Sequence, residues 1–85
     1  IANSNSNISQ ISNYNHKLSF NNPFENDLTF IGDYFPDRTT IVDLNGNQII
    51  SSKSKKINTS NLSPGIYFLV IEIDNKQIIY KSIKL

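Results

Sequence analysis

Few side chains in this 85-residue chain have the types and spacing that catalysis requires. His16 is the only histidine and lies among asparagine and serine residues, so no neighbouring group orients it as a general base. Ser52 and Lys55 have S-x-x-K spacing, but that motif needs a helical turn to bring the lysine beside the serine, and the residues around them favour strand and loop. The sequence therefore predicts no nucleophilic catalysis.

Metal and cofactor chemistry has equally little support. Asp33, Asp37 and Asp43 could offer oxygen ligands to calcium, but their spacing matches no calcium-binding loop. The chain has no cysteine, which excludes a thiol nucleophile, a disulfide and a thiolate metal site. Each of its three glycines is explained by a turn, so no phosphate-binding loop is indicated. We expect no cofactor, no metal and no enzymatic activity in this domain, although it could be the terminal module of a larger secreted enzyme.

Charge and hydropathy exclude two further classes of partner. Eight basic and seven acidic residues are spread along the chain and give a net charge of +1, which provides no attraction for nucleic acid. No apolar stretch approaches the roughly 18 residues that cross a bilayer, so we expect no membrane insertion. The chain begins at Ile1 without a charged and apolar leader, and we expect it to be a piece of a longer protein.

The first 16 residues differ from the rest in composition. They contain nine asparagine or serine residues and no aspartate, glutamate, lysine or arginine. Such a segment buries too little apolar surface to offset the entropy lost on ordering. We expect a flexible linker over residues 1–16 and one folded domain over residues 17–85.

The folded part is organised around residues 62–73, the longest apolar run. Alternate residues are apolar on both sides of a strand here, which predicts a central strand with both faces covered. Leu62, Gly65 and Tyr67 have the arrangement of a tyrosine corner, in which the tyrosine hydroxyl bonds the backbone a few residues upstream where the chain crosses between two sheets.

Turn signals divide the remainder into short strands. Strands are expected at 18–20, 27–31, 38–44, 47–52, 55–58 and 76–85. Asn45-Gly46 predicts a type I′ hairpin turn, and Asp74-Asn75 predicts a second two-residue turn. Seven short strands without helical periodicity predict an all-β fold, an antiparallel immunoglobulin-like β-sandwich.

With the strands placed, the domain resembles the C-terminal sorting domain of type IX (Por) secretion substrates in Bacteroidetes. Four blocks carry the resemblance in order, at residues 21–24 with 27–30, 41–50, 62–70 and 81–85. Together they cover residues 18–85. One departure is that Asn21 stands where the family usually has its first proline.

The resemblance implies a set of sorting-motif residues. They are Asn22, Pro23, Asp43, Gly46, Leu62, Gly65, Tyr67, Lys81, Ile83, Lys84 and Leu85. The two glycines would set turns that need positive φ or close approach. The last strand is the favoured recognition surface, because Lys81 and Lys84 flank Ile83 and Leu85 and offer charge beside an apolar anchor. The alternative role of the two lysines is ordinary solubility. Its edge could also accept a partner strand, which would allow weak self-association.

The resemblance also implies a route. A cleaved leader would export the cargo to the periplasm, and the type IX machinery would translocate it across the outer membrane. A sortase-like peptidase would then cut the accessible linker, leaving the cargo released or anchored to surface lipopolysaccharide. The cargo would thus be found at the outer-membrane surface or outside the cell. Because the chain stops at Leu85 directly after the last block, we expect this to be a natural C-terminus.

Two other readings of the residues stay open. The domain could be an immunoglobulin-like accessory or adhesion module that binds carbohydrate or acts as a spacer, with Tyr34 and Phe35 as the loop aromatics available for a sugar. It could also be a fragment of an enzyme's own fold, which would fold poorly in isolation. The need for the extreme C-terminus in export separates the sorting domain from the accessory module.

Overall fold

The structure, a computed structural model, describes residues 18–85, and the expected linker and His16 lie outside this part of the chain. The described residues form seven strands and no helix, so none of them forms a helix able to cross a membrane. The strands are β1 (Ser19–Phe20), β2 (Asp27–Ile31), β3 (Arg38–Val42), β4 (Gln48–Ser52), β5 (Lys56–Asn58), β6 (Gly65–Ile73) and β7 (Lys76–Lys84).

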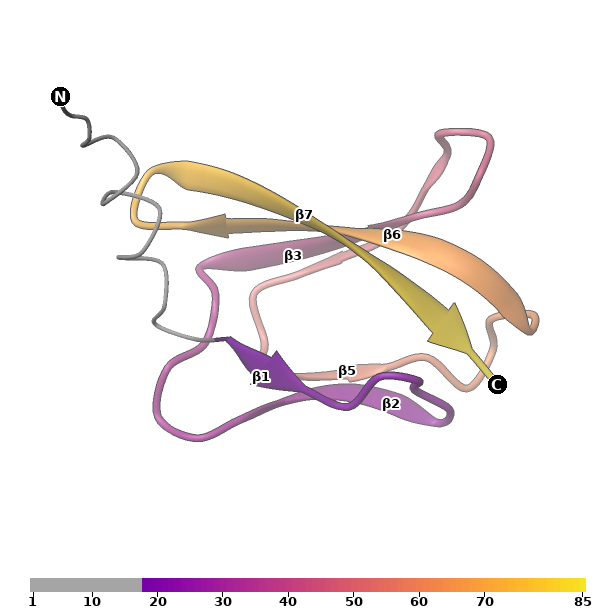
Figure 1. Ribbon diagram of the computed structural model, residues 1–85, viewed down its shortest axis with the longest axis horizontal. Helices are drawn as coiled ribbons and strands as arrows, with labels where there is room; N and C mark the ends of the chain where they lie inside the picture. Colours follow the sequence, from indigo (N-terminus) through magenta and orange to yellow (C-terminus); the bar gives the residue numbers. More distant parts are fainter. Residues whose placement is uncertain (1–17) are drawn as a thin grey trace, which may run out of the picture.

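The strands make two antiparallel sheets that face each other, as Figure 1 shows. One sheet has the order β1-β2-β5 and the other the order β4-β3-β6-β7. Alternate side chains of both sheets meet in one core, whose members are Phe24, Leu28, Phe30, Ile41, Ile57, Tyr67, Leu69, Ile71 and Ile73. The prediction of an all-β sandwich of about seven short strands is confirmed.

The central position of β6 is confirmed, but its covering is not. β6 lies between β3 and β7, and its inward residues Leu69 and Ile71 are fully buried. On the opposite face Ile66 is 39% exposed, and no second layer of the described residues lies over it. The expectation that both faces are covered is therefore wrong for this part of the chain. Among residues 18–85, the outward side chains of β6 are shielded by neighbours in the same sheet, such as Ile83 beside Ile66.

The β3–β4 hairpin corrects the expected turn type. The Gly46 amide donates to the Asp43 carbonyl at 3.0 Å, and Gly46 has a φ of 87°, whereas Asn45 does not have positive φ. A type I′ turn needs positive φ at both central residues, so the loop is instead a three-residue turn that places glycine in the left-handed region. Strand β3 accordingly ends at Val42, two residues earlier than expected.

The second predicted turn has the geometry expected of the first. Asp74 and Asn75 have φ values of 53° and 64°, and they connect the paired residues Ile73 and Lys76. Positive φ at both positions is the signature of a type I′ turn, whose twist matches that of the flanking strands. The long β6–β7 hairpin is therefore continuous from its turn to its open end.

Candidate functional site

The opening and terminal blocks, about sixty residues apart in sequence, are bonded to each other. We call residues 22–24 the clamp and residues 81–85 the terminal segment. The Phe24 amide donates to the Ile83 carbonyl, and the Leu85 amide donates to the Phe24 carbonyl, both at 2.9 Å. In Figure 1 the turn that follows β1 lies beside the yellow end of β7. The clamp thus acts as a short parallel strand on the end of β7.

The side chain of Asn22 adds a second connection to the terminal segment. Its Oδ1 accepts hydrogen bonds from the Ser82 hydroxyl at 2.7 Å and from the Ile83 amide at 3.3 Å. Ser82 is only 1% exposed, and a buried hydroxyl without a partner is destabilising. Asn22 therefore satisfies a buried polar group and covers the strand edge at the same time.

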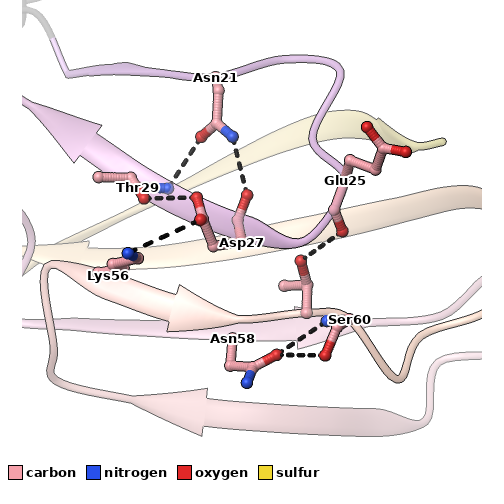
Figure 2. Close-up of polar contacts among 8 residues, drawn as sticks. Asn21, Glu25, Asp27, Thr29, Lys56, Asn58 and Ser60 are labelled. Atoms are coloured by element: carbon pink, nitrogen blue, oxygen red, sulfur yellow. Dashed lines mark hydrogen bonds and ion pairs between the residues drawn. The ribbon is translucent and has the colours of Figure 1, made fainter.

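The preceding asparagine binds the other sheet. Figure 2 shows Asn21 bridging the backbone of β2: its Oδ1 accepts from the Thr29 amide and its Nδ2 donates to the Asp27 carbonyl, both at 2.8 Å. A proline at this position could not make these side-chain bonds. Two consecutive asparagines thus tie the opening turn to both sheets, Asn21 to β2 and Asn22 to β7.

The turn that follows the clamp is held by Thr59, the residue directly after β5. The Thr59 hydroxyl donates to the Glu25 carbonyl at 3.0 Å, and the Thr59 amide donates to the Asn26 carbonyl at the same distance. Beside it, Asn58 Oδ1 accepts from the amide and hydroxyl of Ser60, as Figure 2 shows. The exposed Lys56–Asp27 ion pair, at 3.9 Å, adds little, because solvent screens it. The opening turn is therefore fixed on both sides.

The crossover into β6 packs against the clamp and the terminal segment. Tyr67 Oη donates to the Ser63 carbonyl at 2.7 Å, which confirms the tyrosine corner. Leu62 packs against the core, and the Tyr67 ring lies 6.4 Å from that of Phe24. Gly65 has a φ of 150° and pairs with Lys84. The third block thus underlies the clamp and the terminal segment.

Exposure within the terminal segment alternates. Ile83 is 48% and Leu85 55% exposed, and Lys81 also points outward. Lys84 is only 7% exposed, and its ammonium donates to the Leu85 carbonyl at 2.9 Å. The expectation that Lys84 offers surface charge together with Lys81 is therefore wrong, because period two in a strand sends neighbouring side chains to opposite faces. The outward surface of the terminal segment therefore consists of one cation, Lys81, followed by the exposed apolar side chains of Ile83 and Leu85.

Asp43 and Gly46 do not join this cluster. The hydrogen bonds of Asp43 stay within its own hairpin loop, where Oδ1 accepts from the amides of Asn47 and Asn45, each at 2.9 Å. These bonds favour the ionised carboxylate, and the Asn47 amide contributes most to holding the pKa of Asp43 below its usual value. The position of Asp43 and Gly46 in this loop supports a structural role for them in the second block.

Sequence reasoning did not select Phe24 and Ser82 as site residues. Phe24 is fully buried and supplies the backbone bonds of the clamp, and Ser82 supplies the hydroxyl that binds Asn22. One signal was available for Ser82. It is a polar residue in the inward series of Ile78 and Tyr80, and an inward polar residue requires a partner.

Contacts of the catalytic candidates are structural. Lys55 Nζ donates to the Gly32 carbonyl, and the Ser52 hydroxyl accepts from the Ser54 amide. No group of three or more potential metal ligands occurs among residues 18–85. An open cleft of about 480 Å³ is lined by charges of both signs, from Asp37, Arg38, Lys53 and Glu72, and by Ile73 and Asn75, none of them a sorting-motif residue.

The loop aromatics do not form an open stacking platform. Phe35 is 44% exposed, but the Lys55 ammonium lies 5.8 Å from the centre of its ring. Tyr34 is 36% exposed, and its hydroxyl donates to Asp74 Oδ2 at 3.0 Å. Both rings have partners within the domain, which favours packing over sugar recognition.

Comparison with known families finds one family model whose match spans all four blocks. The family model for the secretion system C-terminal sorting domain matches residues 19–85. No curated protein and no solved structure matches the chain. The match covers all seven strands.

Proposed function

This chain belongs to the family of secretion system C-terminal sorting domains, and from that premise we propose how it works as a signal. The family assigns it to type IX secretion in Bacteroidetes, to interaction with that machinery and to export across the outer membrane. The domain itself is a non-catalytic sorting signal. We propose that the machinery recognises the outward side chains of the terminal segment, Lys81, Ile83 and Leu85.

One observation carries this proposal: the terminal segment is fixed in the backbone while its outward side chains stay exposed. The clamp bonds the backbone of Ile83 and Leu85, whose side chains are 48% and 55% exposed. A fixed backbone reduces the entropy lost on binding, and exposed apolar groups beside a cation provide contact area and orientation. The motif residues next to this surface, Asn22, Pro23, Leu62, Gly65, Tyr67 and Lys84, hold it in place, whereas Asp43 and Gly46 act in their own hairpin.

The steps around recognition complete the proposal. A leader carries the cargo to the periplasm, and the type IX machinery moves it across the outer membrane. A sortase-like peptidase then cuts within residues 1–16, ahead of the folded domain at residues 17–85. The cargo, an enzyme or a non-catalytic protein, is released or anchored at the cell surface. The domain also self-associates weakly through an open strand edge.

An export assay tests the proposal. A fluorescent protein with a periplasmic leader is fused ahead of residues 1–85 in a bacterium that has this secretion system. We expect fluorescence outside the cell with the whole chain, and fluorescence trapped in the periplasm when residues 81–85 are removed. Periplasmic retention of the whole, folded chain would contradict the proposal and favour the accessory-module reading.

A further inference from the structure

We propose that the domain pairs with a second copy of itself through residues 77–81 of β7, with Ile79 on the symmetry axis. This inference deepens the self-association in the proposed function by naming its edge and register. The described residues present four edge strands. β1 has two residues and β5 has three. β4 has five residues, and its pairing with β3 contains a register shift. β7 has nine residues in unbroken register. Long, regular edges are the ones that accept another strand.

The clamp determines how much of this edge is open. Both the amide and the carbonyl of Ile83 bond to the clamp, so they point away from β6. Backbone groups of residues two apart in an antiparallel strand point the same way. The amides and carbonyls of Gln77, Ile79 and Lys81 therefore point to the open edge. No hydrogen bond from the described residues reaches them there.

This open stretch is compatible with twofold symmetry. With Ile79 opposite Ile79 of the second copy, Gln77 lies opposite Lys81. In each of these pairs, the backbone amides and carbonyls of the two residues point toward each other. Ile79 is 60% exposed, so the central pair buries apolar surface, and no two lysines face each other. Ser82 lies opposite Lys76, the residue next to the Asp74–Asn75 turn. Strand β7 of the second copy thus ends at the position on this edge where the clamp begins.

A five-residue pairing buries much less than the ~1,600 Å² of a standard interface, so we expect a dissociation constant on the order of 0.1–1 mM. Sedimentation equilibrium and amide exchange of the 85-residue chain are measured from about 0.05 to 2 mM, which spans that range. Protection of the Gln77, Ile79 and Lys81 amides should rise with concentration. Protection of the Ile78 and Tyr80 amides, which point toward β6, should not change.

Three substitutions at exposed positions test the register. Ile79→Lys puts two cations on the axis and should abolish association. Ile66→Lys adds the same charge to the same sheet face but away from the edge, and should leave association unchanged. Gln77→Lys faces Lys81 of the second copy and should weaken association roughly 3- to 30-fold, yet within one copy it faces Glu72 and should not reduce folding stability.

Monomer at every concentration would overturn the inference. Loss of association with Ile66→Lys would indicate packing of sheet faces instead, and unchanged association with Gln77→Lys would exclude this register. The export assay separates the two proposals. Export by a chain that never dimerises refutes only the pairing, and dimerisation by a chain that is not exported refutes only the sorting function.

Discussion

At the residue scale, Asn22 connects the two ends of the domain. A single amide oxygen accepts from the buried Ser82 hydroxyl and from the Ile83 amide, so one side chain both satisfies the core of β7 and covers its edge. Asn21 makes the corresponding contacts on β2. The opening block therefore connects the two sheets through hydrogen bonds of the Asn21 and Asn22 side-chain amides.

Asn22→Ala is expected to destabilise the domain by about 1–3 kcal/mol, because it leaves the Ser82 hydroxyl buried without an acceptor. Urea unfolding measures the change. The double variant with Ser82→Ala should lose less than the sum of the single variants, since it removes both partners. Asn26→Ala, on an exposed neighbour, is the control and should change stability by less than about 0.5 kcal/mol. Equal effects of Asn22→Ala and Asn26→Ala would refute the connector role.

A second prediction concerns the pH dependence that Asp43 gives to its hairpin. The pKa of Asp43 is lowered in the folded chain, chiefly by the Asn47 amide, so its stabilising contribution is full above the unfolded value of about 3.9. It is lost as pH falls through the lowered folded value. Urea unfolding measures the stability difference between the parent chain and Asp43→Asn. This difference should shrink as the pH falls from about 5 to the lowered pKa of Asp43 in the folded chain. A difference independent of pH would contradict this assignment.

At the element scale, the strands were predictable and some turns were not. Period-two alternation determines which residues of β2, β3 and β6 enter the core, and it does not depend on distant contacts. The turn at Asn45-Gly46 depends on Asp43, whose carboxylate binds the Asn45 and Asn47 amides and permits a three-residue loop. The prediction of a type I′ turn from the Asn-Gly dipeptide alone takes no account of Asp43.

Substitutions in this loop distinguish the two turn types. Gly46→Ala should destabilise the hairpin by roughly 1–2 kcal/mol, because φ at Gly46 is 87° while the space around it is open, so the loss comes from the backbone alone. Asn45→Ala is the matched control and should change little, because Asn45 lacks positive φ. Unfolding midpoints give both values. Comparable losses at the two positions would restore the type I′ turn.

At the scale of the whole molecule, the clamp brings the start of the folded domain to its terminal segment. The resemblance could place the blocks in order, but it could not predict that residues 22–24 pair with residues 83–85, since that contact depends on the closure of the sandwich. For the same reason it could not predict that Lys84 is buried while Lys81 is exposed. The sequence identified the family, and the fold selects which of its residues face outward.

The most direct test replaces the proposed recognition surface without deleting a strand. Lys81, Ile83 and Leu85 are changed together to serine in the export fusion. The matched control changes Lys53, Ile49 and Leu44, exposed side chains of the same three types around the β3–β4 hairpin, to serine. Both variants should stay folded, since only outward side chains change. We predict that the first variant remains in the periplasm and that the control reaches the medium. Export of both variants at the parental level would contradict recognition through the terminal segment.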